Sequence, residues 1–389
     1  MDTTPVIVEA VRTTSGKGKP GGALSDRHAA DLLADVLTEL VNRSGVDPGA
    51  VDDVIAGCVT QGGEQAGNIA RSAVLAAGFP EHVPGTTVDR QCGSSQQAVH
   101  FAAQGIAAGA YDVVIAGGVE LMSRTPMFSQ YGDHDPYGPR VAARYSPGLI
   151  QQGLSAELLA REYGFSRLEL DEFAAESHRR AALTWEQGGF ARETISPGGG
   201  RGDETVRAGT TVEKLATLPP AFADPSVLQR FGALDWKVTA GNSSPYTDGA
   251  SGILLMSRSA AERFGLRPRA RFLGYAVVGD DPVRMLRGIV PATKKVLDRA
   301  RLAVSDIDSF EVNEAFAVVP MLWARELKVD HDRLNPRGGA IALGHPLGAS
   351  GTRLMTTLLH ELEDSGKTLG LQTMCEAGGT ANATVIERL

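Results

Sequence analysis

The chain has 389 residues, of which 42% are hydrophobic and 22% are charged, and its formal net charge is −8. This length and composition are typical of a globular protein of two or three domains and exclude a disordered or low-complexity chain. The acidic balance argues against nucleic-acid binding, which would require a basic surface.

No apolar run approaches the roughly 20 residues that a membrane-spanning helix needs, and residues 1–10 show no targeting pattern. We therefore expect no membrane association and a cytoplasmic location. The three cysteines, Cys58, Cys92 and Cys375, are widely separated and form no CxxC pair. This set predicts neither a disulfide framework nor a metal site, so a reactive thiol is the hypothesis to pursue.

The first third of the chain alternates short apolar runs with helical patterns. Helices are expected over 26–42 and 94–109. Strands are expected over 6–9, 51–59, 86–89 and 112–118. Such alternation predicts a layered α/β fold.

Residues 121–243 are polar, rich in Gly and Pro punctuation and less periodic. Helices are expected over 155–163 and 168–187, and an exposed turn over 198–203. We interpret this segment as a domain inserted over a functional site, because long irregular segments often carry function.

A partial internal repeat relates 44–61 to 301–316, since each passes from an amphipathic helix through an acidic turn into a strand. Each half then presents a reactive residue, Cys92 or His345, followed by a long helix. Two similar α/β halves would place matching helix N-termini near a shared centre. The strands that follow these helices are matched through two glycine pairs, Gly117-Gly118 and Gly378-Gly379.

Cys92 lies where an expected strand ends and a helix begins. The N-terminus of a helix carries partial positive charge and unpaired N–H groups, and both favour a thiolate nucleophile. A buried structural cysteine is the alternative for this residue alone. Cys58 also follows a strand, but no glycine pair is close, and we interpret it as structural.

Three further positions combine reactive side chains with element ends. His345 follows the apolar run 340–343, interpreted as a strand, and suits a proton carrier, with a packed loop histidine as the alternative. Cys375 ends a strand before two glycines. Asn313 ends another, where it either holds a water or carbonyl oxygen or caps a helix.

Two glycine-rich segments do not match nucleotide-binding motifs: 16–22 lacks the Walker A order, and 338–344 is not GxGxxG. Four other segments, taken in order, resemble the signature blocks of the thiolases, and a fifth is similar to their coenzyme A-binding loop. The four are CGSSQQA at 92–98, NEAFA at 313–317, GGAIALGHPLGASGTR at 338–353 and MCEAGG at 374–379; the fifth is TAGNSSPYTDGA at 239–250.

The resemblance covers the whole chain and implies a thiolase-like five-layered αβαβα core of two duplicated halves with an inserted loop domain. It implies an N-terminal half of residues 1–120 plus about 244–268, a coenzyme A-binding loop domain of 121–243 and a C-terminal half of 269–389. It also implies a homo-oligomer, at least a dimer and expected to be a tetramer.

The resemblance further implies roles for single residues. Cys92, deprotonated by His345, would be acylated by the substrate, and Cys375 would move the proton of the second step. Asn313, through a water, and His345 would form one oxyanion hole. The backbone N–H groups of Cys92 and Ala377 would form the other.

Acyl-CoA is the expected substrate, with coenzyme A as co-substrate, and no permanently bound cofactor or metal is expected. The implied reaction is thiolysis of 3-ketoacyl-CoA or the reverse Claisen condensation, since the catalytic residues do not encode a direction. The expected substrate and coenzyme A contacts are Ser244, Gln152, Met285, Ala315 and Phe316.

The sequence departs from the usual family pattern in three places. Ala377 replaces a glycine, Gln151-Gln152 replaces a His-Met pair, and Pro219 stands where many relatives have an arginine. The second departure favours a degradative role with a bulkier or longer acyl group, and the C-terminal run resembles actinobacterial degradative thiolases, including those for steroid side chains. Met285 matches the short-chain biosynthetic type instead.

Alternative functions remain. One is a short-chain biosynthetic acetoacetyl-CoA thiolase. A condensing synthase of the same superfamily generally has His at the position of Cys375. A non-catalytic acyl-CoA-binding protein would be expected to lack Cys92, His345 or Cys375. A Cys-His-Asn hydrolase would need no second cysteine.

Overall fold

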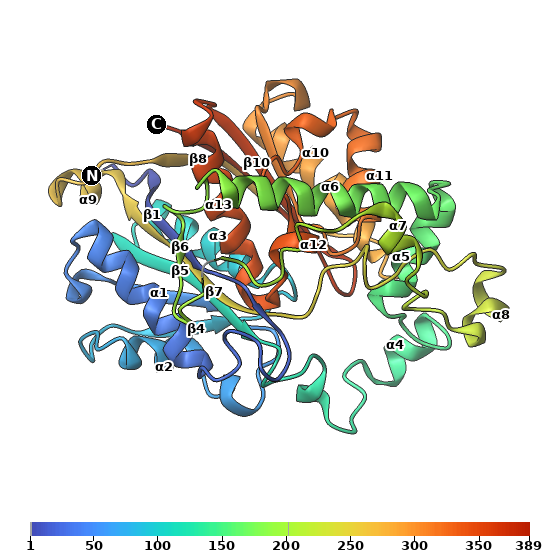
Figure 1. Ribbon diagram of the computed structural model, residues 1–389. Coiled ribbons are helices and arrows are strands. Elements are labelled where there is room, and N and C mark those ends of the chain that lie inside the picture. Colours follow the sequence, from blue (N-terminus) through green and yellow to red (C-terminus); the bar gives the residue numbers. More distant parts are fainter. Residues whose placement is uncertain (1, 201) are drawn as a thin grey trace.

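The computed structural model describes residues 2–200 and 202–389, which form a mixed α/β protein (Figure 1). The strands are β1 (Pro5–Thr13), β2 (Gly16–Lys17), β3 (Asp53–Gly57), β4 (Gly85–Val88), β5 (Val113–Leu121), β6 (Thr194–Ile195), β7 (Thr247–Ser257), β8 (Ala270–Gly279), β9 (Ser309–Val312), β10 (Leu369–Glu376) and β11 (Thr380–Arg388). The helices are α1 (Ala29–Ser44), α2 (Ile69–Ala76), α3 (Ser94–Ala107), α4 (Gly138–Arg144), α5 (Gln152–Glu162), α6 (Arg167–Glu186), α7 (Val212–Ala216), α8 (Leu228–Phe231), α9 (Arg258–Arg263), α10 (Ile289–Ala300), α11 (Val318–Leu327), α12 (Ala340–Leu343) and α13 (Ser350–Asp364).

The main strands follow the order β4-β3-β5-β7-β1-β8-β11-β10-β9. The junction in the middle is narrow, because β1 and β8 share only the pairs Val6–Arg271 and Ile7–Ala270. We therefore describe two half-sheets, β4-β3-β5-β7-β1 and β8-β11-β10-β9. In the first half-sheet β3 pairs in parallel with both β4 and β5, and in the second β9 pairs in parallel with β10. The other pairs within the two half-sheets are antiparallel.

Both faces of the half-sheets are apolar because both are covered by helices. In β3, Val54 packs with α1 and α2, whereas the next residue, Ile55, packs with α3 and α13. In the other half-sheet Phe310 packs with α10 and α11, and Ile386 packs with α13. Helices α3 and α13 therefore form a middle layer between the half-sheets, and the expected αβαβα arrangement is confirmed (Figure 1).

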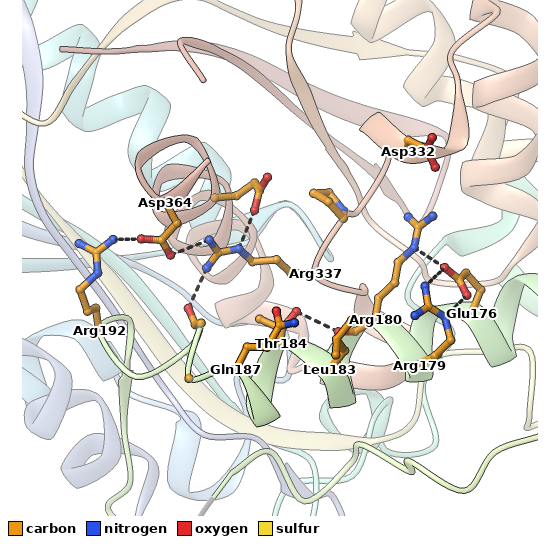
Figure 2. Close-up of a pocket in the computed structure, with 14 residues that line it drawn as sticks. Glu176, Arg179, Arg180, Leu183, Thr184, Gln187, Arg192, Asp332, Arg337 and Asp364 are labelled. Carbon is orange, nitrogen blue, oxygen red and sulfur yellow. Dashed lines mark hydrogen bonds and ion pairs between the residues drawn. The ribbon is translucent and has the colours of Figure 1, made fainter. Parts of the chain in front are cut away.

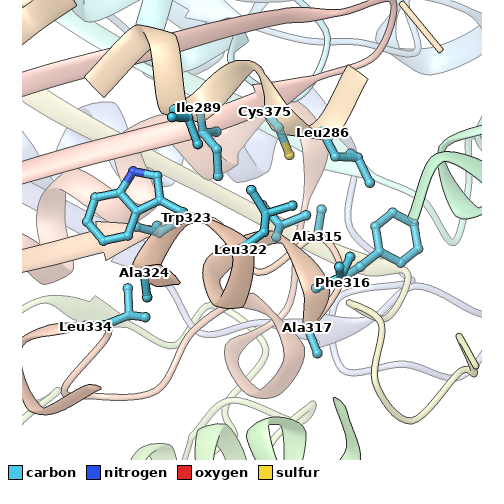
Figure 3. Close-up of a cluster of buried hydrophobic side chains, with 14 of the residues drawn as sticks. Leu286, Ile289, Ala315, Phe316, Ala317, Leu322, Trp323, Ala324, Leu334 and Cys375 are labelled. Carbon is cyan, nitrogen blue, oxygen red and sulfur yellow. The ribbon is translucent and has the colours of Figure 1, made fainter. Parts of the chain in front are cut away.

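The outermost layer of the C-terminal half is a close-packed cluster on α10 and α11. Trp323 is fully buried, meets Phe310 edge to face at 5.0 Å and donates its indole N–H to Thr293 Oγ1 at 2.8 Å. Figure 3 shows that the Cys375 side chain reaches from β10 into this cluster beside Leu286. One side of the candidate site is thus built from the apolar core itself.

The two halves repeat with a constant spacing. Corresponding elements begin at Pro48 and Val304, at Ser94 and Ser350, and at Val113 and Leu369, and each pair differs by 256 in residue number. The predicted repeat of 44–61 in 301–316 is therefore present.

The predicted matches in the rest of the repeat, Cys92 with His345 and Gly117-Gly118 with Gly378-Gly379, were wrong. The spacing matches Cys92 with Gly348, not with His345, and it matches Gly117-Gly118 with Thr373-Met374. The two glycine pairs are alike only in sequence, because Gly117-Gly118 lies inside β5 whereas Gly378-Gly379 makes the turn from β10 to β11.

The segment between the halves is tied to the N-terminal half-sheet. Strand β6 pairs in parallel with β1, and the buried Arg12 of β1 binds Glu193 at 2.6 Å and Asp203 at 2.8 Å. In the expected turn 198–203, residues 198–200 are exposed and Arg201 lies outside the described residues. Asp203 is buried, so the expected exposure was wrong there, because Arg12 draws this carboxylate inward. The domain limits given above stay a prediction.

The run 340–343 is the short helix α12 and not the expected strand. A carboxylate explains the difference, because Glu314 accepts the N–H of Ile341 at 3.2 Å in the first turn of α12. The helices expected over 155–163 and 168–187 are confirmed as α5 and α6. No helix in the described part of the chain combines the length and apolar character that crossing a bilayer requires.

Candidate active site

The N-termini of α3 and α13 meet in the middle layer. The backbone N–H of Thr352 donates to Ser95 Oγ at 3.0 Å, joining the first turns of the two helices. Gly351 lies against the backbone of Gln96 so closely that a Cβ at this glycine would overlap the Gln96 nitrogen. The expectation that matching helix N-termini share a centre is confirmed, and this centre is where Cys92 lies, two residues before α3.

Cys92 is 4% exposed and packs with Met122, Leu347 and Met374. Leu347 is two residues from His345 and Met374 precedes Cys375, so the loop before α13 and the end of β10 both contribute to the apolar cluster that holds Cys92. The Gln152 side-chain amide, on the first residue of α5, lies 4.0 Å from Cys92 Sγ. Burial raises the pKa of the Cys92 thiol to about 12, and the Gln152 amide acts in the opposite direction.

His345 is held by three contacts. Its backbone N–H donates to Thr247 Oγ1 at 3.0 Å, its Nδ1 lies 2.6 Å from Ser350 Oγ, and its Nε2 lies 3.4 Å from Asn313 Nδ2. Because the Ser350 hydroxyl donates to the carbonyl of Pro346 at 2.8 Å, Nδ1 is the donor to Ser350. We therefore assign the imidazole proton to Nδ1, which leaves a lone pair on Nε2.

Burial lowers the pKa of His345 to about 3, and the Arg353 guanidinium acts in the same direction. The imidazole is consequently neutral near pH 7 and suited to accept a proton. Asn313 follows β9, and its Nδ2 is available near Nε2 while its Oδ1 has no hydrogen bond to any described residue. The two side chains form one buried polar unit together with the hydroxyls of Ser350 and Thr247.

Cys375 is fully buried near the end of β10. Burial raises the pKa of its thiol, and the charges of Cys92 and Glu376 raise it further, which places the two sulfurs within electrostatic reach of each other. Its apolar surroundings include Met285, Ala315 and Phe316, with Ala377 partly buried against the same cluster.

The residues expected to contact substrate lie on this apolar side. Phe316 meets Phe222 of the inserted segment edge to face at 5.6 Å. Ser244 binds the carbonyl oxygen of Ala315 twice, through its backbone N–H at 3.0 Å and its hydroxyl at 3.1 Å. The structure therefore brings Ser244, Ala315 and Phe316 together beside the Cys375 cluster, and Gln152 beside Cys92.

Two supporting residues were missed from the sequence. Ser350 orients His345, and Thr247 fixes its backbone. A serine five residues after the histidine, at the start of an expected helix, was the only available signal for Ser350. Cys58 is fully buried, as its structural interpretation requires.

A cavity of about 710 Å³ lies elsewhere, between α6 and α13 (Figure 2). Its arginines are already matched with carboxylates: Arg337 binds Glu361 at 2.8 Å, and Arg192 binds Asp364. Figure 2 shows Asp364 between Arg192 and Arg337, and Glu176 beside Arg179 and Arg180, so little positive charge is left for an anionic ligand. Within residues 2–200 and 202–389, no group of three or more His, Cys, Asp or Glu side chains is arranged to hold a metal ion.

Comparison with known proteins gives a consistent result over the whole chain. The family model for the N-terminal domain of thiolase matches residues 5–259, and that for the C-terminal domain of thiolase matches residues 266–388. The chain is 48% identical to the steroid 3-ketoacyl-CoA thiolase FadA6 of Mycobacterium tuberculosis, over 100% of this chain and 95% of that protein. It is 45% identical to a 3-ketoacyl-CoA thiolase of Klebsiella pneumoniae, over 99% of both. The solved structure of the Bacillus anthracis acetyl-CoA acetyltransferase superposes with a TM-score of 0.87 at 39% identity, covering 99% of both chains.

Proposed function

The chain belongs to the thiolase family, and from this premise we propose how its own residues carry out the reaction. It is an acyltransferase that cleaves 3-ketoacyl-CoA with coenzyme A through an acyl-cysteine intermediate. The observation that supports the residue roles is the convergence of Cys92, the His345–Asn313 unit and Cys375 at the N-terminus of α3.

In the first step Cys92 is the nucleophile and His345 Nε2 accepts its proton. The thiolate attacks the 3-keto carbon, and the bond between C2 and C3 breaks. The Asn313 amide, through a water, and His345 stabilise the tetrahedral oxyanion. The departing acetyl-CoA enolate takes a proton from Cys375, and the shortened acyl group stays on Cys92.

In the second step Cys375 takes the proton of the incoming coenzyme A thiol. The resulting thiolate attacks the acyl-cysteine, the shortened acyl-CoA leaves, and Cys92 recovers its proton from His345. The backbone N–H groups of Cys92 and Ala377 serve as the second oxyanion hole. Condensation is the same sequence in reverse, with Cys375 removing a proton from the methyl of acetyl-CoA.

We assign substrate contacts to the apolar side of the site. The acyl group is bulky or long, because Gln151-Gln152 stands where short-chain relatives have a His-Met pair. A relative named for steroid substrates is also 48% identical to this chain. The contacts with acyl and pantetheine groups are Gln152, Ser244, Met285, Ala315 and Phe316. Thiolysis rates with acetoacetyl-CoA, a medium-chain and a steroid-like 3-ketoacyl-CoA test this choice, and a preference for acetoacetyl-CoA would overturn it.

We also propose a cytoplasmic homo-oligomer, at least a dimer and expected to be a tetramer. Strand β4 supports this, since it ends the strand order and its outer edge has no strand partner among the described residues. Light scattering of the purified protein tests the assembly, and a monomer would contradict it.

Trapping of the acyl-enzyme tests the roles of the two cysteines. The intact mass of Cys92→Ser should gain no acyl group from 3-ketoacyl-CoA. Cys375→Ser should still be acylated, at a reduced rate, but should fail to transfer the acyl group to coenzyme A. Normal turnover by Cys375→Ser would show that the second base is misassigned. Transfer of the acyl group to water in place of coenzyme A would identify a hydrolase.

A further inference from the structure

Glu376 is a buried carboxyl group that the reaction above does not use. It follows Cys375 in β10, but its side chain points the other way, toward α3. It lies against Gly93, where an added Cβ would overlap its Oε1. The residue is 0% exposed, and neither carboxyl oxygen makes a hydrogen bond to a described residue. An ionised carboxylate without donors is strongly disfavoured in such a place.

The other half of the fold shows what this position requires for a stable charge. Glu120 is its counterpart, 256 residues earlier at the end of β5. Glu120 is equally buried, yet it accepts four hydrogen bonds, from the N–H groups of Val59 (3.0 Å), Thr60 (3.0 Å) and Gly348 (2.8 Å) and from the amide of Gln65 (2.8 Å). Gly348 is in turn the counterpart of Cys92. The carboxyl group that faces the Gly348 loop therefore has four donors that act against the rise in its pKa caused by burial. The carboxyl group that faces the Cys92 turn makes no such hydrogen bonds.

The ionisable groups around Glu376 come from two parts of the chain, the turn before α3 and its own strand β10. Asp89 and Arg90 lie in the turn before α3, Cys92 lies next to Gly93, and Cys375 precedes Glu376 in its own strand. The remaining polar neighbour is the hydroxyl of Thr380 at the start of β11. Burial raises the pKa of Glu376 to about 8, and Asp89 raises it further, whereas Thr380 and Arg90 act against burial.

We propose that Glu376 is a positioning residue for Cys92: a neutral carboxylic acid that packs under the turn before α3 and leaves the positive end of that helix to the Cys92 thiolate. When Glu376 ionises, its negative charge opposes the thiolate. This inference rests on the proposed role of Cys92 as nucleophile. It adds a second ionisable group that influences the pH at which the Cys92 thiolate forms.

Alkylation of Cys92 by iodoacetamide tests the inference without turnover. The rate is followed from pH 7 to pH 9.5 by peptide mass spectrometry, which separates Cys92 from Cys58 and Cys375. In Glu376→Gln no charge develops, so the ratio of the variant rate to the native rate should rise about tenfold across this range, since one nearby like charge shifts a pKa by about one unit. A ratio that stays constant would overturn the inference.

Glu311→Gln is the matched control. Glu311 is buried, its pKa is raised to about 8 by burial, and it is not among the groups that act on Cys92. Its rate ratio should stay flat, and a rise equal to that of Glu376→Gln would show a general effect of alkaline pH and contradict the inference.

A second variant covers the case in which Glu376→Gln does not fold. Thr380→Val removes the hydroxyl that lowers the pKa of Glu376 and should move the alkaline break in the native alkylation profile to higher pH. An unmoved break would contradict the inference. If Cys92→Ser still formed an acyl-enzyme, the proposed function would fail, while these alkylation ratios would still decide the role of Glu376.

Discussion

At the scale of single residues, the site depends on removing two reactive groups from water. The Cys92 thiol and the His345 imidazole are both uncharged at rest, because burial disfavours the thiolate and the imidazolium alike. In the proposed reaction, proton transfer between them creates a thiolate, which the N-terminus of α3 is placed to stabilise. The site therefore carries these buried charges only during the reaction.

A pH dependence follows from the lowered pKa of His345. The imidazole titrates near 6.5 when exposed and near 3 when folded, so Nε2 keeps its lone pair well below pH 6.5. We expect the rate of acyl-enzyme formation to show no acid limb near pH 6.5 and to stay level down to about pH 5. Rapid-quench mass spectrometry of the acyl-enzyme measures this rate. A break with a midpoint at about 6.5 would mean that the imidazole is exposed and that its burial is misjudged.

The same group affects stability with a defined sign. The unfolded chain binds a proton on His345 below about pH 6.5 whereas the folded chain does not, so this residue makes the free energy of unfolding fall with decreasing pH. The slope is at most about 1.4 kcal/mol per pH unit. The intrinsic fluorescence of the protein, measured at each pH, should therefore accompany the rate measurement to show that the chain is still folded.

The candidate reactive residues could be proposed from the sequence, whereas the contacts that support them could not. Cys92, His345 and Cys375 stand beside glycines at element ends, a pattern that is visible without a fold. The orientation of His345 depends on Ser350, and the setting of Glu376 depends on Gly93, which is 283 positions earlier in the chain. Contacts between such distant residues leave no local signal.

At the scale of elements, the contact between α3 and α13 sets the distance between the two halves of the site. We expect Gly351→Ala to lower the free energy of unfolding by about 2 kcal/mol and to slow acylation of Cys92, because the added methyl would overlap the Gln96 backbone and force the helices apart. Urea denaturation and intact-mass kinetics measure the two effects.

Gly279→Ala is the matched control, since a Cβ at Gly279 meets no atom within 4 Å. It should change the free energy of unfolding by less than about 0.5 kcal/mol. Equal losses of unfolding free energy in both variants would show that close contact between α3 and α13 is not required for stability.

Element types were largely predictable, and their register was not. Helices expected over 26–42 and 94–109 are found as α1 and α3, because a helix that packs on one face retains the periodicity of its apolar residues. The run 340–343 is apolar without periodicity, so its sequence does not distinguish a strand from a helix. There a residue distant in sequence, Glu314, stabilises the helix by accepting the N–H of Ile341. The register of the repeat failed for a similar reason, since glycine pairs recur in a strand and in a turn.

At the scale of the whole molecule, the inserted segment is joined to the N-terminal half-sheet by buried charge. We expect Arg12→Met to lower the free energy of unfolding by about 3–5 kcal/mol, because the substitution leaves the carboxylates of Glu193 and Asp203 buried without their cation. Chemical denaturation measures the loss. Arg179→Met removes an exposed pair with Glu176 and should cost less than about 1 kcal/mol. Similar losses in the two variants would show that the Arg12 cluster does not hold the segment.

The layer order has a consequence for synthesis on the ribosome. Cys92 and α3 are translated early, but α13 and β10, which cover them, come from residue 350 onward. The part of the inner face that α13 covers, over β1 and β7, therefore stays open to water, and the thiol stays open to oxidants, until α13 and β10 have been made. A nascent or truncated chain would expose this face to chaperones and proteases, so loss of the last elements should abolish accumulation of the protein as well as its activity.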